Sequence, residues 1–348
     1  MSVDSGALPG VDVPALRRYF AEWIPQCRGP LDLSLIAGGR SNLTYLVTDG
    51  HSRWVLRRPP LGPLTPTAHD MGREHRVVAA LGAGGVPVAR AVAYCPDPGV
   101  IGAPFSIMSY VDGRVLRDGD EAAALPPGDA RRCAEALIDA LALLHAVDPA
   151  SVGLGDLGRP VGYLARQVRR WYGQWSRVAT RELPTLDELH RRLARSTPPE
   201  SGASIVHGDY RMDNVILDHA EVGTILAIVD WEMAALGDPL ADLGLTLVYW
   251  DPVCAPVLGV RHAPTANPGF PTGAWLAARY AERSGRDVSA LAFYQALGYL
   301  KLAVIAEGIH ARHLAGQTVG AGYDAVGSAV PALVRAGLDT LTARRGRP

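Results

Sequence analysis

Hydrophobic spacing divides the chain into a strand-rich first third and a helix-rich remainder. Apolar residues recur at helical intervals over 13–23, and Asp12 stands where it could cap the first turn. Alternating apolar and polar residues predict strands over 31–36, 43–48, 52–60, 90–95 and 104–110, with a helix ending near Gly82 before the last two. From about residue 120 helical spacing dominates and predicts helices over 130–147, 162–176, 186–195, 273–282, 288–310 and 325–344.

Two short apolar runs in the second half each lead into an acidic residue. Residues 205–206 run into His207, Gly208 and Asp209, and residues 225–229 end at Asp230. Asn214 follows Asp209 by five positions. This arrangement suits phosphoryl transfer, in which one carboxylate accepts a hydroxyl proton while an amide and a second carboxylate hold Mg²⁺ against the phosphates.

The same order and spacing occur in the protein-kinase catalytic loop, where a base aspartate precedes an asparagine by five positions and a metal-binding aspartate follows a later strand. A simpler interpretation is a β-hairpin in which Asp209, Asn214 and Asp230 cap turns. The second motif at a suitable distance favours the catalytic interpretation.

With these motifs the sequence resembles the aminoglycoside phosphotransferase family of kinase-like enzymes. The stretch 229–232, Val-Asp-Trp-Glu, followed by Gly-Asp-Pro-Leu-Ala-Asp-Leu over 237–243, is most similar to the branch related to the kinase-like domain that precedes some acyl-CoA dehydrogenases. The resemblance runs from about Leu33 to about Ala311. It implies ATP and Mg²⁺ as cofactors and a small molecule as acceptor.

The resemblance also implies roles for individual residues. Asp209 is expected to be the catalytic base, with Asn214 and Asp230 as the metal ligands. Three further residues are expected to support them: His207 and Asp242 by holding the catalytic loop through hydrogen bonds, and Arg211 by neutralising nearby charge. His145, near the end of a predicted helix, is interpreted as structural rather than catalytic.

The nucleotide is expected to bind to the strand-rich part. Four residues between two predicted strands form a loop whose backbone amides could lie over phosphates: Gly38, Gly39, Ser41 and Asn42. The kinase pattern requires a cation at the end of the third strand. No lysine precedes residue 301, so the cation must be Arg57, with Glu74 as its partner. The alternative is an ordinary surface ion pair.

Met108 and Tyr110 precede Gly113 in a stretch that resembles the kinase hinge, where backbone groups meet the adenine edge; both could equally be core residues. We therefore expect an α+β, bilobal protein-kinase-like fold. Residues 1–112 would form the N-lobe, with its antiparallel sheet and a helix, and residues 113–348 a mainly helical C-lobe with the catalytic loop and acceptor site. ATP would lie in the cleft between them.

Composition narrows the functional classes. The 348 residues have a net charge of −1, which gives no reason to expect nucleic acid as a partner. No apolar run is long enough to span a membrane, and the first 13 residues lack a secretory pattern. The four cysteines are scattered, as suits thiols in a reducing cytoplasm. The oligomeric state is not indicated.

The distribution of charged residues is the feature of the sequence that bears on the identity of the acceptor. Residues 151–200 hold nine arginines against five acidic residues, and residues 261–348 hold ten basic against five acidic residues. An acceptor site for polycationic aminoglycosides should be rich in carboxylates, so an anionic or neutral acceptor, such as a hydroxyacyl-CoA, is the better hypothesis. Aminoglycoside O-phosphotransfer is the alternative, and a non-catalytic, pseudokinase-like nucleotide-binding protein is an alternative of another class.

Overall fold

The computed structural model describes residues 8–36, 42–62, 69–318 and 322–343. The chain forms two compact units. The first comprises the residues up to Asp112 together with Leu226–Glu232, and the second comprises Gly113–Ile225 and the residues from Met233 onward. The first unit therefore includes a second segment of the chain. The single boundary near residue 113 that the sequence suggested does not account for this segment.

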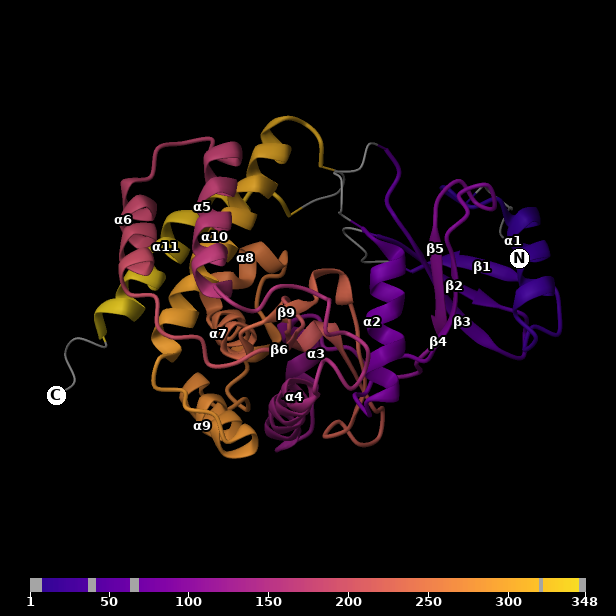
Figure 1. The fold of residues 1–348 in the computed structure, drawn as a ribbon, viewed down its shortest axis with the longest axis horizontal. Coiled ribbons are helices and arrows are strands. Elements are labelled where there is room, and N and C mark those ends of the chain that lie inside the picture. Colours follow the sequence, from indigo (N-terminus) through magenta and orange to yellow (C-terminus); the bar gives the residue numbers. More distant parts are fainter. Residues whose placement is uncertain (1–7, 37–41, 63–68, 319–321, 344–348) are drawn as a thin grey trace. The chain divides into compact units, whose positions relative to one another are not determined.

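The first unit is built on a five-stranded antiparallel sheet with the strand order β1-β2-β3-β5-β4. Its strands are β1 (Asp32–Leu35), β2 (Leu43–Thr48), β3 (Arg53–Arg58), β4 (Ala91–Cys95) and β5 (Phe105–Ser109). Two helices accompany the sheet, α1 (Val13–Trp23) and α2 (Met71–Ala83) (Figure 1). Asp12 and Asp70 cap these helices by accepting hydrogen bonds from backbone N–H groups in the first turn.

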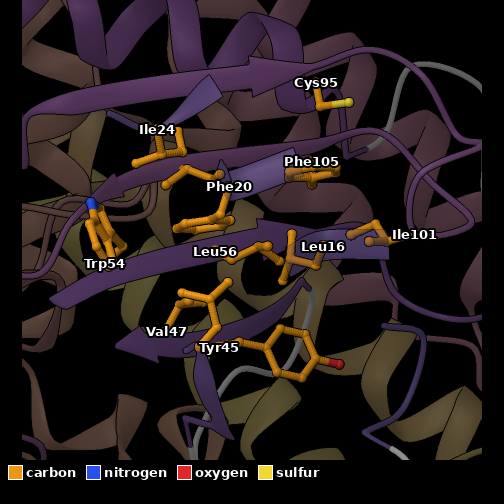
Figure 2. Close-up of a cluster of buried hydrophobic side chains, with 12 residues drawn as sticks. Leu16, Phe20, Ile24, Tyr45, Val47, Trp54, Leu56, Cys95, Ile101 and Phe105 are labelled. Atoms are coloured by element: carbon orange, nitrogen blue, oxygen red, sulfur yellow. The ribbon is translucent and has the colours of Figure 1, made fainter. Parts of the chain in front are cut away.

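Side chains on β3 alternate between the two faces of the sheet. Trp54 and Leu56 point into a buried apolar cluster with Phe20 of α1 (Figure 2). The rings of Phe20 and Trp54 meet edge to face, with centroids 5.4 Å apart. Arg57 lies on the other face, where it contacts Glu74 of α2. The strand period of two therefore places a packing residue and a charged residue next to each other in the sequence but on opposite faces.

The segment 226–232 is held to the first unit by its backbone. Strand β8 (Ile225–Ile228) ends where Ile228 N donates a hydrogen bond of 2.8 Å to Pro87 O. The indole of Trp231 then folds back, and its Nε1 donates to Ile228 O at 2.9 Å. These contacts fix Asp230 against the first unit although it is distant in sequence.

The second unit is mainly helical. Its helices are α3 (Gly119–Ala123), α4 (Asp129–Ala146), α5 (Tyr163–Val178), α6 (Pro184–Arg195), α7 (Pro239–Tyr249), α8 (Ala255–Leu258), α9 (Gly273–Ser284), α10 (Leu291–Leu314) and α11 (Val326–Ala343). Its short strands include β6 (Ser204–Val206) and β9 (Ala235–Gly237), which pair antiparallel, and β7 (Val215–Leu217). Single 3₁₀ turns span Met212–Asn214, Pro252–Cys254 and Pro264–Ala266, and a further one, Trp231–Met233, begins in the first unit.

Helix α10 is the centre of the second unit. It packs against α5, α6, α7 and α11 (Figure 1). Its side chains are buried around most of its circumference. The predicted helices lie within a few residues of those found. The short helices α3 and α8 were not predicted because each is too short to show a period. None of the helices in the described ranges has the length and apolar character needed to cross a membrane.

Candidate active site

The residues after β6 form a loop that is fixed by a buried carboxylate. Asp242, in the first turn of α7, accepts hydrogen bonds from His207 N at 2.5 Å and Gly208 N at 2.8 Å. Gly208 has φ +84°, and a Cβ added to it would lie 2.8 Å from Met233 O. Only glycine meets both conditions, so the residue before Asp209 is determined by backbone geometry.

Asp242 is itself supported by histidine. His145 Nε2 lies 3.3 Å from its carboxylate, and His145 Nδ1 lies 2.7 Å from the Tyr280 hydroxyl. Burial alone would raise the pKa of Asp242, but the hydrogen bond and charge of His145 and the Gly208 N–H outweigh it, and the pKa falls below its usual value. Asp242 is therefore a buried anion whose partners are all supplied by the protein.

Asp209 lies at the end of this loop with both carboxylate oxygens engaged. The Tyr249 hydroxyl donates to Oδ1. Asn214 Nδ2 donates to Oδ2 at 3.1 Å and to the backbone oxygen of Asp209 at 2.8 Å, and Arg211 Nε lies 3.3 Å from Oδ2. The side chain keeps about 20% of its surface exposed, so a bound hydroxyl could still reach it.

The charge state of Asp209 follows from these neighbours. Burial would raise its pKa, but the positive charges of Arg211 and Lys301 and the Tyr249 hydrogen bond outweigh burial and lower it. Burial and the nearby Asp209 charge raise the pKa of Tyr249 well above its usual value. Tyr249 therefore acts as a proton donor in its hydrogen bond, and Asp209 is the acceptor.

Two side chains have the chemistry needed for Mg²⁺. Because the amide nitrogen of Asn214 is used by Asp209, its amide oxygen is the atom that can face a metal. Asp230 is a non-glycine residue with φ +68°, and about 30% of its side chain is exposed. Carboxylate and amide oxygens are hard ligands of the kind that Mg²⁺ prefers, so these residues fit the expected metal.

Arg57 connects Asp230 to α2 within the first unit. Its Nη1 lies 2.8 Å from Glu74 Oε1, and its Nη2 donates to Asp230 Oδ1 at 2.9 Å. Burial would lower the pKa of Arg57, but the two carboxylates outweigh it and raise the pKa. Burial raises the pKa of Glu74 to about 7 against the opposing effect of Arg57. The structure thus pairs Arg57 and Glu74 directly, and phosphate binding by Arg57 remains a prediction.

The predicted phosphate loop is described only at its end. Gly38, Gly39 and Ser41 lie outside the described residues. Asn42 is buried, and its side chain donates to Glu232 Oε2 at 3.2 Å and lies 2.8 Å from His69 Nδ1. It anchors the start of β2 to the segment that carries Asp230. Contact of Asn42 with a nucleotide remains a prediction.

The two residues assigned to the hinge lie at the end of β5. Met108 is opposite Val55 in the sheet. Tyr110 N donates to Arg53 O at 3.1 Å, and the Arg53 guanidinium carbon lies 4.4 Å from the Tyr110 ring centroid. Because this N–H already has a backbone acceptor, an adenine contact at Tyr110 would have to use its carbonyl group. The hinge assignment remains a prediction.

Sequence reasoning missed two side chains near the catalytic loop, Tyr249 and Lys301, and one in the first unit, Glu232, which accepts a hydrogen bond from Asn42. Tyr249 and Lys301 belong to helices that are far from the loop in sequence, and nothing in their local pattern separates them from core residues. Lys301 did carry a signal, since it is the single lysine in the chain. Glu232 lies inside the quoted motif but was given no role.

The antiparallel sheet, the helical second unit and the Asp209–Asn214 geometry define the class of a kinase-like α+β phosphotransferase. Comparison with known proteins supports the same class. The chain belongs to the phosphotransferase enzyme family, whose family model matches residues 32–279.

Relatives in this family are similar over most of the chain. Acyl-CoA dehydrogenase family member 11 of Gallus gallus is 38% identical over 320 residues, which cover 88% of this chain and 40% of that protein. Acyl-CoA dehydrogenase family member 10 of Mus musculus is 34% identical over 292 residues, covering 83% and 27%. The chain therefore spans less than half the length of these relatives.

Solved structures show the same fold. A Ralstonia eutropha JMP134 protein assigned as an aminoglycoside phosphotransferase is 31% identical, with a TM-score of 0.82, over 96% of this chain and 99% of that one. Choline kinase from Cryptosporidium parvum Iowa II is 12% identical, with a TM-score of 0.66, over 95% and 96%. The second likeness concerns the fold alone. The expected kinase-like α+β fold is confirmed.

The buried position of Arg57 gives a stability prediction. Arg57→Met leaves Glu74 and Asp230 without their shared cation, and the loss of one partner from a buried ion pair costs about 3–5 kcal/mol. We expect a drop of this size in the free energy of unfolding, measured by urea denaturation at pH 8. The control is Arg53→Met on the same strand, because Arg53 pairs with an exposed Asp112 and should behave like wild type. Equal effects of the two variants would show that the Arg57 pair is not buried in solution.

Proposed function

We propose that the protein transfers the γ-phosphoryl group of Mg-ATP to a hydroxyl group of a small molecule. The observation that carries this proposal is the environment of Asp209. It is a partly exposed carboxylate that Tyr249, Asn214 and Arg211 hold in one orientation. A carboxylate placed in this way can accept a proton at the moment when the hydroxyl oxygen attacks phosphorus.

In the proposed reaction the acceptor oxygen forms a bond to the γ-phosphorus, and the bond between that phosphorus and the β–γ bridging oxygen breaks. The acceptor proton passes to Asp209, and ADP leaves with the electron pair of the broken bond. Asp230 and Asn214 would hold Mg²⁺, which neutralises charge on the phosphates when bound. Arg57 would add a phosphate contact, fixed in place by Glu74.

For the acceptor we propose an anionic molecule, with a hydroxyacyl-CoA as the specific hypothesis. Two observations support it. Arg211 and Lys301 act on Asp209, and Arg170 is close enough to act on Lys301, so three cations lie around the proposed base; Asp213 offsets one of them by pairing with Arg211 at 2.9 Å. The curated relatives are named as acyl-CoA dehydrogenase family members, which suggests acyl-CoA as a substrate class for the family branch.

Aminoglycoside phosphorylation is the second candidate. It is favoured by the likeness to the Ralstonia eutropha protein, which is assigned as an aminoglycoside phosphotransferase and is 31% identical over almost the whole chain. A polycationic acceptor would have to approach Asp209 against the charges of Arg211 and Lys301. This electrostatic cost makes it the weaker candidate.

Asp209→Ala should abolish transfer and leave nucleotide binding intact, because the base acts on the acceptor and not on ATP. We expect kcat to fall by at least about 100-fold, the lower end of the usual contribution of general base catalysis. An assay of ADP formation measures kcat, and titration calorimetry with nucleotide measures the binding affinity separately. Turnover like that of the wild type would remove Asp209 from its role. Absence of turnover in the wild type itself would favour a protein that binds nucleotide without catalysis.

Asp230→Ala should instead weaken Mg-nucleotide binding itself. We expect the dissociation constant to rise at least about tenfold, since even indirect partners of metal ligands are commonly worth 10–100-fold. The measurement is nucleotide titration at limiting Mg²⁺. The same titration in EDTA is the control, because a lost metal ligand matters only when the metal is present. A defect of the same size in EDTA would mean that Asp230 acts through Arg57 rather than through Mg²⁺.

The acceptor hypothesis predicts a charge preference. Purified protein would be assayed for ADP and GDP release against hydroxyacyl-CoA thioesters and against aminoglycosides. We expect turnover of the thioesters, with a KM that rises as ionic strength increases from about 0.05 to about 0.3 M, because salt screens arginine and lysine contacts with phosphate. Efficient turnover of kanamycin with none of the thioesters would overturn the acceptor assignment and leave the phosphotransfer reaction standing.

A further inference from the structure

Lys301 is an exception in the composition of the chain. It is the only lysine, and the other 33 of the 34 basic residues are arginines. It lies in the middle of α10, a helix that is buried around most of its circumference. An ammonium group is a compact charge with three donors, whereas a guanidinium is a planar fork. The one position with the compact cation is therefore a half-buried position on a mostly buried helix of the second unit.

The Lys301 ammonium reaches the loop that carries Asp209. Nζ donates a hydrogen bond to Gly208 O. On the other side of the same residue, Gly208 N donates to Asp242 Oδ1 at 2.8 Å. The two polar backbone groups of Gly208 are thus held from two different helices. Because Gly208 also has φ +84° and a Cβ built on it would lie 2.8 Å from Met233 O, no other residue fits this position easily.

We propose that Lys301 is a positioning residue of the candidate active site, which fixes the peptide bond between Gly208 and Asp209 and so sets the orientation of the Asp209 carboxylate. This inference rests on the proposed function, because it assigns Lys301 to the same reaction. Asp242 alone holds the amide side of Gly208. Without Lys301 the carbonyl side would lose its donor, and the peptide that leads into Asp209 would be held less firmly, by the hydrogen bond of 3.2 Å that Asp209 N donates to His207 Nδ1.

The charges around Lys301 support this role. Burial lowers the pKa of Lys301, the charges of Asp209 and Asp242 oppose that effect, and Arg170 adds to it. The ammonium also lies 5.5 Å from the centroid of the Trp171 ring, a cation–π distance. The desolvated cation is thus compensated by the two carboxylates that form the site, one at the loop and one on α7. The charge of Lys301 lowers the pKa of Asp209, and the charge of Asp209 raises the pKa of Lys301.

The kinetic test compares substitutions on α10. Lys301→Met keeps the length of the side chain and removes the donor and charge. We expect kcat to fall about 100-fold, as a misplacement of about 1 Å can cost this much, with the nucleotide KM unchanged. Arg312→Met removes a cation from the last turn of the same helix and should leave both constants unchanged. In Lys301→Ala, added ethylammonium ions should restore part of kcat.

These kinetic outcomes separate positioning from a general structural role. A folded Lys301→Met variant with normal kcat would overturn the inference. So would a loss in Lys301→Ala that ethylammonium does not restore, because a missing donor is replaceable and a distorted helix is not.

A second test needs neither an acceptor nor turnover. Because the chain has one lysine, protein labelled with ¹³C at lysine Cε gives one lysine signal, and this signal reports the titration of Lys301. The charged groups that face it are Asp209, Asp242 and Arg170. We expect a midpoint below that of free lysine, and a still lower one in Asp209→Asn, because that change removes a negative charge that favours the ammonium form.

The outcomes of this titration distinguish the two proposals. Equal midpoints in wild type and Asp209→Asn would overturn the Lys301 inference whatever the enzyme turns over. A lowered midpoint in Asp209→Asn, combined with no turnover of any acceptor, would support the coupling of Lys301 to Asp209 and overturn the proposed function.

Discussion

The buried carboxylate of Asp242 is the constraint on which the second unit's part of the site depends. A desolvated anion is costly unless it is hydrogen-bonded on several sides, and here the donors are the loop amides of His207 and Gly208, with His145 alongside. The loop therefore cannot move without leaving a buried charge unsatisfied. Catalytic geometry and stability are coupled through one side chain.

The sequence around Asp242 explains why it is placed there. Asp238 caps α7 by accepting a hydrogen bond from Leu240 N at 3.0 Å. Pro239 occupies the first position of the helix, where a backbone N–H would have no partner within the helix, so the missing N–H of proline costs nothing. Asp238 also accepts from Ser201 N and from the Tyr294 hydroxyl, both at 2.8 Å. The start of the helix is thus fixed on several sides, and Asp242, one turn later, is directed at the loop.

The sequence predicted the parts of the site that are encoded by short spacing. Asn214 is five residues from Asp209, and the 3₁₀ turn Met212–Asn214 brings its amide back onto that carboxylate. The pairing of Arg57 with Glu74 could also be predicted, because a strand leads into the helix that carries the partner.

The parts of the site that the sequence did not predict depend on tertiary packing. Tyr249 is 40 residues from Asp209, Lys301 is 93 residues from Gly208, and His145 is 97 residues from Asp242. Contacts at such separations are set by how helices pack, and a single sequence has no local pattern that records them. For the same reason the expected boundary at residues 112–113 missed the return of the segment 226–232 to the first unit.

A regional charge count does not show which arginines are free to meet an acceptor, because it does not place them. Arg191 and Arg192 pair with Glu188, and Arg181 pairs with Glu307. The excess that matters is local and small, and it consists of the cations that act on Asp209 directly or through Lys301. An acceptor hypothesis based on charge therefore depends on three side chains, Arg170, Arg211 and Lys301, rather than on a surface.

Arginine at position 57 changes what the expected phosphate clamp can do. A lysine would offer a point charge, but the planar guanidinium presents separate N–H groups to Glu74 and Asp230 at once. Asp230 has φ +68°, a left-handed conformation that costs roughly 1–2 kcal/mol in a non-glycine residue. The bond from Arg57 helps to hold it there. In this chain the cation of the clamp and the carboxylate assigned to the metal are therefore linked in the first unit itself, and a change at either residue alters the orientation of the other.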